Sequence, residues 1–251
     1  QEHVGSGQAP CSYMLRMVRF CLHPAVRFSL GASCSRATLC SSMAHGADLT
    51  HGAGLAGKPQ EVASPVDVLY LHGFGRKDPL QCPIYGALRH ALKGRSEIRL
   101  HAPIYHPGRE IAATRLGQTL EELRKTATSL PSGHFAVVVG YSVGGLLAAL
   151  LQESNPEMVG SMLLLAPAVD NYARNFQEVA PKDWYMPAEY VEELRSLSPR
   201  PTIKVRTVLL HGELDDDSGG SYPWRVREWA AAEHFEKCYF PAVPHSLQPW
   251  L

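Results

Sequence analysis

Ser142 is the residue of this sequence whose surroundings most clearly suggest chemistry. It is the centre of Gly-Tyr-Ser-Val-Gly at residues 140–144, the G-x-S-x-G pattern of a nucleophile elbow. In such an elbow a serine lies on a sharp strand-to-helix turn in strained backbone geometry, and glycines permit the close packing. Residues 135–139 favour a buried strand and residues 145–151 a buried helix. This context favours a nucleophilic serine over a glycine-rich turn with an incidental serine.

A general base and an acid follow further along the chain. A serine hydroxyl is a weak nucleophile, so it needs a base within hydrogen-bond reach, and the base needs an acid that fixes its tautomer. His245 follows the expected strand 238–242, and Asp215 lies on the loop after the expected strand 205–211. The chain order Ser142, Asp215, His245 separates this arrangement from other serine hydrolases. The alternative for His245 is a surface histidine on a turn.

The identity of the acid stays open at this point. Asp215 is favoured because its offset from the end of the strand suits the reach to His245. A solvated acidic loop is the alternative interpretation of this stretch. The other candidate carboxylates are Glu213, Asp216, Asp217 and, after a neighbouring strand, Asp170.

Backbone amides are the expected donors to an oxyanion. One is the amide of Val143, directly after the nucleophile, and the other is the amide of Phe74 in the loop after the expected strand 66–71. His72 and His211 each precede a glycine at a strand end. For both histidines we expect support of a loop rather than catalysis.

The elements that position these residues alternate along the chain, which favours an α/β fold. Mostly parallel, doubly wound sheets with helices on both faces have such patterns, and they bind ligands beyond the carboxyl ends of their strands. All the residues above follow expected strands. The expected strands are 66–71, 98–102, 135–139, 162–166, 205–211 and 238–242, and the expected helices are 84–92, 111–130, 145–151 and 223–235.

Composition excludes several classes of function. Lys plus Arg and Asp plus Glu both number 24, so no net charge attracts nucleic acid to the whole molecule. No stretch has the roughly 20 apolar residues of a membrane-spanning helix. The 6 cysteines form no C-x-x-C pair, so we expect reduced thiols, no metal and no cofactor. The oligomeric state is not indicated.

The first 60 residues differ in composition from the rest. Residues 3–47 contain no acidic side chain but several arginines and serines, as in a transit peptide for a mitochondrion or plastid. We expect this stretch to be removed and to add nothing to the folded core, with a flexible lead-in over residues 44–64. Initiation at Met14, Met17 or Met43 is possible, and a start at Met43 would favour a cytoplasmic location.

The motifs of residues 61–251 together resemble the α/β-hydrolase superfamily. The resemblance rests on Leu-His-Gly-Phe-Gly at 71–75, the elbow, His-Gly-Glu-Leu-Asp at 211–215 and Pro-His-Ser at 244–246. Within it, the opening Leu-Tyr-Leu-His-Gly-Phe is similar to small YqiA-type esterases. The resemblance implies a Ser-His-Asp hydrolase of carboxylic esters or thioesters that forms an acyl-enzyme. An acyltransferase and a non-catalytic ligand-binding homologue are the alternatives.

The resemblance also implies two features of the architecture. The fold would be a minimal version, because nothing before residue 66 is similar to the first two strands of the full fold. Residues 170–204 would form a short cap over the site. Its aromatic side chains either line an acyl pocket or pack the cap onto the core.

Overall fold

The computed structural model describes residues 16–18, 21, 65–73, 79–105, 115–169, 188–198, 200–215 and 222–247. The strands are β1 (Val66–Leu71), β2 (Ile98–His101), β3 (Val137–Tyr141), β4 (Ser161–Leu165), β5 (Arg206–Leu210) and β6 (Lys237–Tyr239). The α-helices are α2 (Pro83–Leu92), α3 (Leu116–Ser129), α4 (Val143–Ser154), α6 (Ala188–Ser196) and α7 (Pro223–Ala232). Two short 3₁₀ helices are η1 (Pro79–Gln81) and η2 (Pro156–Met158).

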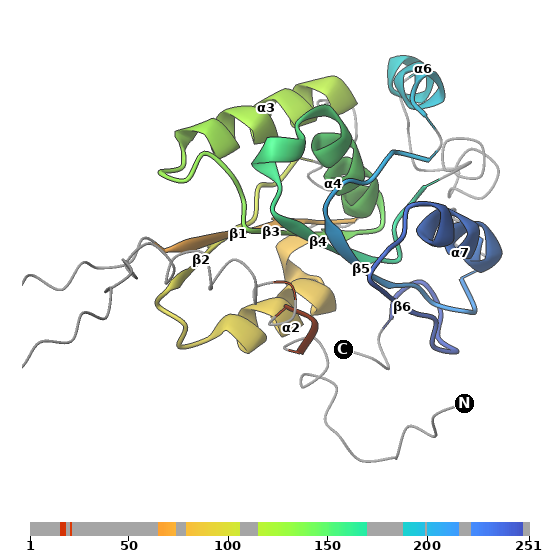
Figure 1. Ribbon diagram of the computed structural model, residues 1–251, viewed down its shortest axis with the longest axis horizontal. Coiled ribbons are helices and arrows are strands. Elements are labelled where there is room, and N and C mark those ends of the chain that lie inside the picture. Colours follow the sequence, from red (N-terminus) through yellow and green to blue (C-terminus); the bar gives the residue numbers. More distant parts are fainter. Residues whose placement is uncertain are drawn as a thin grey trace, which may run out of the picture.

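The described strands form one parallel sheet, as the sequence predicted. Its order is β2-β1-β3-β4-β5-β6, and every neighbouring pair is parallel (Figure 1). The order reverses at β1, which lies between β2 and β3, and a sheet of this kind binds ligands in the crevice at such a switch point. The register pairs Leu71 with Gly140 and Tyr141 with Leu165. The loops that follow β1, β3 and β4 therefore start at the same edge of the sheet.

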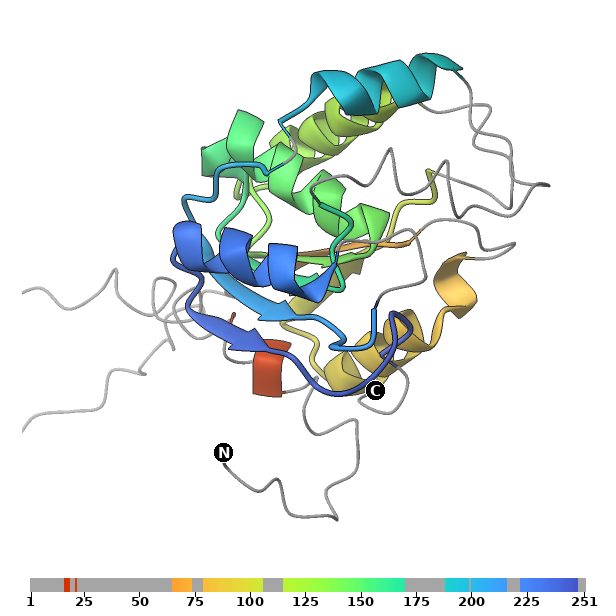
Figure 2. The same ribbon diagram turned by 90° about the vertical axis from the view of Figure 1, so that its right-hand side faces the viewer.

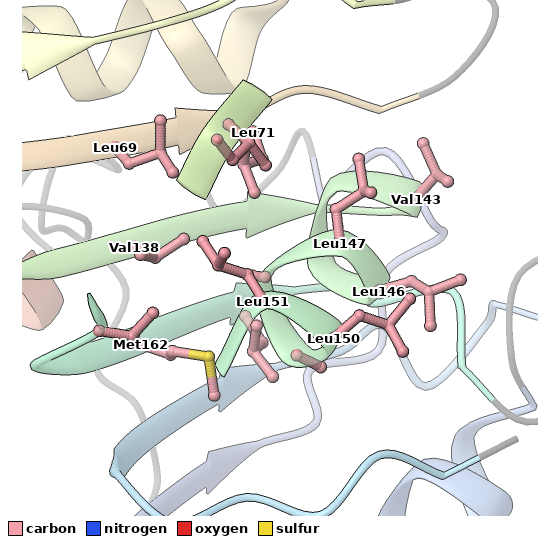
Figure 3. Packing of buried hydrophobic residues seen from close by; sticks show 14 of the residues in the cluster. Leu69, Leu71, Val138, Val143, Leu146, Leu147, Leu150, Leu151 and Met162 are labelled. Atoms are coloured by element: carbon pink, nitrogen blue, oxygen red, sulfur yellow. The ribbon is translucent and has the colours of Figure 1, made fainter. Parts of the chain in front are cut away.

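Helices α3, α4, α6 and α7 contribute buried side chains to the core on one face of the sheet. Figure 1 shows α3, α4 and α6 together on that side. Helix α4 is apolar almost all round, which is the expected pattern of a helix buried between neighbours. Figure 3 shows its leucines against side chains of β1, β3 and β4. The elbow is thus held between a strand and a helix that are both deeply buried.

The opposite face is covered by α2 and by part of the N-terminal stretch. Met17, Val18 and Cys21 have exposed fractions of 5%, 0% and 1% and share a core cluster with side chains of β1, β3, β4 and β5. The expectation that the first 60 residues add nothing to the core is wrong at these positions, because their apolar side chains pack on the sheet. Cleavage of a leader, and the location of the protein, remain predictions.

The element boundaries differ from the expected ones in places. Helix α7 ends at Ala232, three residues before the expected end, where His234 adopts a positive φ of 54°. Helix α4 begins directly after Ser142, earlier than expected. Strand β3 starts at Val137, because Phe135 makes only an isolated bridge to Val159. Helix α6 lies within the expected cap, where no helix was predicted.

Candidate active site

Ser142 lies on a strained turn between β3 and α4. Its φ of 54° and ψ of −120° are unfavourable for a residue with a side chain, so the surrounding structure must enforce them. Its N–H donates to the Leu165 carbonyl (2.9 Å), and its own carbonyl accepts from the N–H groups of Gly145 and Ala168 (2.9 Å each). The backbone conformation is that of a nucleophile elbow.

The glycines beside the serine allow the elbow to pack against β1. A Cβ atom on Gly140 would lie 2.5 Å from the carbonyl oxygen of Gly144. A Cβ atom on Gly144 would overlap the carbonyl group of Leu71. Neither position can therefore hold a side chain without moving the turn, which is the physical reason for both glycines in the motif.

His245 and Asp215 form a hydrogen-bonded pair at the carboxyl ends of β6 and β5. The distance from His245 Nδ1 to Asp215 Oδ2 is 2.7 Å, and the Asp215 side chain is buried. Two backbone hydrogen bonds join the loops, from Glu213 N–H to the Pro241 carbonyl (2.7 Å) and from Leu214 N–H to the Val243 carbonyl (3.2 Å). With the carboxylate accepting from Nδ1–H, the Nε2 atom of the neutral ring is a proton acceptor.

A second imidazole approaches the same carboxylate. The ring of His211 is fully buried at the end of β5, and its Nε2 atom lies 3.5 Å from Asp215 Oδ2. The N–H of His211 donates to the Tyr239 carbonyl (2.9 Å), which holds the end of β5 beside β6. The expected role of His211 was loop support, and its contact with the acid was not foreseen. In the sequence, the spacing of four residues between His211 and Asp215 is the feature that indicates this contact.

Tyr141 connects the elbow to two other parts of the site. Its hydroxyl donates to the His245 carbonyl (3.4 Å), and the two rings lie 5.3 Å apart. A Cβ atom on Gly73 would lie 2.9 Å from the Tyr141 ring and 3.2 Å from Ser142 Cβ. Tyr141 therefore lies close to the loop after β1 and to the turn that carries His245. Sequence analysis assigned no role to it, since the motif allows any residue at this position.

His72 supports the loop after β1, and its imidazole ring has a defined protonation state. Its Nδ1–H donates to the Gly73 carbonyl (2.8 Å), so its Nε2 atom can accept from the Tyr105 N–H (3.4 Å). Tyr105 stacks on the ring at 3.9 Å, and its hydroxyl donates to the His72 carbonyl. Burial lowers the pKa of His72 to about 4, despite the opposing hydrogen bond to Gly73. The ring is therefore neutral near pH 7, as its supporting role requires.

The structure describes some of the predicted site residues and not others. It brings Asp215 and His245 together, and Ser142 lies at the same edge of the sheet. Val143 is the first residue of α4, where an N–H has no partner within the helix and the helix dipole favours negative charge. The other predicted residues lie outside the described residues: Phe74, Asp170, Asp216 and Asp217.

Neither a metal site nor a membrane-spanning helix is found among the described residues. Within those parts of the chain, no group of three or more His, Cys, Asp or Glu side chains is arranged to hold a metal ion. Each described helix is too short or too polar to cross a bilayer.

Comparison with known proteins gives structural neighbours but no sequence relatives. No family model and no curated protein matches the chain. Est1E from Butyrivibrio proteoclasticus, solved with ferulic acid bound, has 16% identity and a TM-score of 0.56 over 73% of this chain and 82% of its own. Mouse alpha/beta hydrolase domain-containing protein 10 has 16% identity and a TM-score of 0.55, over 72% and 82%. A monoacylglycerol lipase from Paleococcus ferrophilus has 16% identity and a TM-score of 0.51, over 72% and 87%.

These neighbours and the parallel sheet define the class of protein: the chain has the α/β-hydrolase fold. At this level of identity, the likeness establishes the fold and not the reaction.

Proposed function

We propose that the protein is a serine hydrolase that cleaves a carboxylic ester or thioester through an acyl-enzyme. The hydrogen bond from His245 to the buried Asp215 at 2.7 Å carries this proposal. This pair follows β5 and β6 at the sheet edge where Ser142 lies on its strained turn. A nucleophile, a base and an acid in this chain order are the components of a Ser-His-Asp triad.

The mechanism assigns one role to each side chain. Ser142 Oγ attacks the substrate carbonyl carbon while His245 Nε2 accepts the hydroxyl proton, and Asp215 stabilises the resulting imidazolium. The tetrahedral intermediate collapses, the alcohol or thiol leaves with the proton from His245, and an acyl-serine remains. Water then attacks the acyl carbonyl with His245 as base. The carboxylic acid is released and the proton returns to Ser142.

The backbone amides of Val143 and Phe74 are the proposed donors to the oxyanion. The position of Val143 at the N-terminus of α4 supports its part, because a helix N-terminus favours negative charge. The hydrogen bond from His72 to the Gly73 carbonyl supports the proposed part of the Phe74 amide. That carbonyl belongs to the peptide unit that contains the N–H of residue 74, and a peptide unit is planar.

The substrate class is proposed from the chemistry and from the neighbours. Est1E was solved with ferulic acid bound, and the neighbour from Paleococcus ferrophilus is a monoacylglycerol lipase. The name of the lipase concerns an ester substrate, and a bound carboxylic acid is the kind of product that ester hydrolysis releases, so both support an ester over a thioester. The narrower likeness to YqiA-type esterases remains part of the proposal.

The decisive experiment compares variants on p-nitrophenyl acetate and butyrate. Ser142→Ala should lower kcat by about 10⁴-fold or more, and His245→Ala should have a similar effect. Asp215→Asn should lower kcat by about 10⁴-fold, because the amide favours the wrong tautomer of His245. Ser196→Ala, which removes the hydroxyl of an exposed serine on α6 away from the site, is the matched control. Unchanged hydrolysis by a folded Ser142→Ala variant would contradict the proposal.

Two further measurements separate the alternatives. A fluorophosphonate probe should label Ser142 of the wild type and not of Ser142→Ala. If the well-folded wild type is not labelled, the chain is better explained as a ligand-binding homologue. If an added alcohol or thiol accepts the acyl group more readily than water, the enzyme is an acyltransferase on the same residues.

A further inference from the structure

The two halves of one sheet face are covered by different parts of the chain. This face carries apolar side chains from β1, β3, β4 and β5. Helix α2 covers the side of β1, where the rings of Tyr70 and Tyr85 lie 5.2 Å apart. The helices α3, α4, α6 and α7 contribute to the cluster on the opposite face. Among the described residues, the cover over β4 and β5 must therefore come from elsewhere.

Residues of the N-terminal stretch provide this cover. Met17, Val18 and Cys21 belong to the same buried cluster as Leu163 of β4 and Val208 of β5. Figures 1 and 2 show residues 16–18 in red on the same side of the sheet as α2, and Figure 2 shows them beside β5 and β6. We call residues 16–18 and 21 the N-terminal segment.

Hydrogen bonds fix the segment to the start of β4. The Cys21 thiol donates to the Met162 carbonyl (3.6 Å), and the Cys21 carbonyl lies 3.2 Å from the Ser161 hydroxyl, whose one proton is shared with the Ala136 carbonyl (3.0 Å). These partners are about 140 positions apart in the sequence. The segment is thus attached by specific polar contacts as well as by burial of apolar side chains.

This placement is incompatible with removal of the whole N-terminal stretch as a presequence. A presequence is removed after import, so a cut after Cys21 would expose the apolar side chains of β4 and β5 to water. A chain that starts at Met43 would lack the cover in the same way. Exposed apolar faces of this kind lead to aggregation or require a new partner.

We propose that the face over β4 and β5 is a docking surface for the N-terminal segment of the same chain, which stays in the mature protein. Any leader that is removed ends before Arg16. This inference does not depend on the proposed hydrolase activity. It concerns which part of the chain must be present for the domain to be stable.

Thiol protection in the full chain tests whether the segment is docked. Burial raises the pKa of the Cys21 thiol to about 12, and the docked thiol is also inaccessible. Cys21 should react with iodoacetamide at least about 100-fold more slowly in the native than in the urea-unfolded protein, measured by peptide mass spectrometry. Cys82, buried in the same cluster, is the protected control, and the exposed Cys238 is the reactive control. Native labelling of Cys21 at the unfolded rate, with Cys82 still protected, would overturn the proposal.

Truncation tests whether the segment is required. Removal of residues 1–14 should leave Tm unchanged, whereas removal of residues 1–24 should lower Tm by about 10 °C or more and increase binding of the dye ANS. Val18→Asp in the full chain should act like the longer truncation, because it places a charge against the sheet, whereas Val18→Ile should not. A synthetic peptide of residues 12–26 should raise the Tm of the longer truncation. Equal Tm for both truncations would overturn the proposal.

Discussion

At the scale of single residues, Asp215 Oδ2 has two imidazole rings beside it. His245 Nδ1 lies at 2.7 Å and His211 Nε2 at 3.5 Å, with both the acid and the His211 ring buried. The other charged groups described on this loop and on α7 include Glu213, which forms an ion pair with Arg227. An N–H aimed at a buried carboxylate stabilises its negative charge. We therefore predict that His211, with a proton on Nε2, positions the proposed acid.

Replacement of His211 tests this role through a pH profile. His211→Phe keeps a ring of similar size but removes the N–H, so Asp215 should attract the proton on His245 more strongly. The acidic limb of kcat/KM against pH should move up by a few tenths of a pH unit or more, and kcat/KM should fall about tenfold. His211→Gln, which can place an N–H near Asp215, should restore much of both. A lower Tm with an unmoved limb would mean that His211 only fills space.

Residue types and spacing predicted which side chains of the candidate site lie together better than they predicted how those side chains pack. The elbow motif identified Ser142, and the offset of Asp215 from its strand correctly indicated a carboxylate that reaches His245. Tyr141 was missed, because its partners come from two distant parts of the chain. Tyr105 was missed for the same reason, since its stacking on His72 joins residues 33 positions apart. No local pattern contains such contacts.

At the scale of elements, a carboxylate on the side of α6 binds the N-terminal end of α3. Glu193 of α6 accepts hydrogen bonds from the N–H groups of Leu116 (2.9 Å) and Gly117 (2.7 Å) in the first turn of α3. These amides have no partner within the helix, and the N-terminus favours an anion. A Cβ atom on Gly117 would lie 2.8 Å from Glu193 Oε1. The contact thus explains why a glycine occupies a helical position.

A double-mutant cycle in urea tests this contact. Glu193→Ala should lower the free energy of unfolding by about 1 kcal/mol, as the loss of a cap does. Gly117→Ala normally stabilises a helix by about 0.5–1 kcal/mol, but here the methyl group should displace Glu193 and cancel the gain. In the Glu193→Ala background, Gly117→Ala should stabilise. Glu192→Ala, on the exposed side of α6, is the control. Additive effects would show that the two residues do not interact.

Helix α6 also shows where element prediction fails. Its buried side chains, Tyr190, Val191 and Leu194, occupy one helical face. Three apolar positions among charged residues are too few to stand out in a stretch that also contains prolines and aromatic residues. The strands were predicted well, by contrast, because those in the middle of a parallel sheet are buried on both faces and consist of continuous apolar runs.

At the scale of the whole molecule, the stability of the fold should depend on two titrating groups far from each other in the sequence. Burial lowers the pKa of His72 to about 4 in the folded protein, against about 6.5 in an unfolded chain. For Asp67, burial alone would raise the pKa, but hydrogen bonds from Arg99 (2.5 and 2.9 Å) and His101 (2.6 Å) outweigh it, so the pKa is lowered. Both groups therefore bind protons more readily in the unfolded state.

The sign of the pH dependence follows from this difference. As the pH falls from about 6.5 to 4, the unfolded chain takes up a proton at His72 and the folded protein does not, so the free energy of unfolding decreases. The slope for one such group is at most about 1.4 kcal/mol per pH unit, and the loss by pH 4 is about 3 kcal/mol. Below about pH 4, protonation of Asp67 removes its contribution as well, since a lowered carboxyl pKa stabilises the fold only while the group is charged.

Urea unfolding at pH 7, 6, 5, 4 and 3 should reveal both contributions, that of His72 above pH 4 and that of Asp67 below it. His72→Asn cannot titrate, yet its amide can donate to the Gly73 carbonyl in place of Nδ1–H, so its stability should fall less steeply from pH 6 to pH 5. The difference in slope should approach about 1 kcal/mol per pH unit. His90→Asn, on the exposed side of α2, controls for the loss of a histidine. Asp67→Asn should be less stable at pH 7 and should converge with the wild type at low pH. Parallel curves for wild type and His72→Asn would contradict the assignment, because a neutral, buried His72 requires the folded and unfolded proteins to bind different numbers of protons in that range.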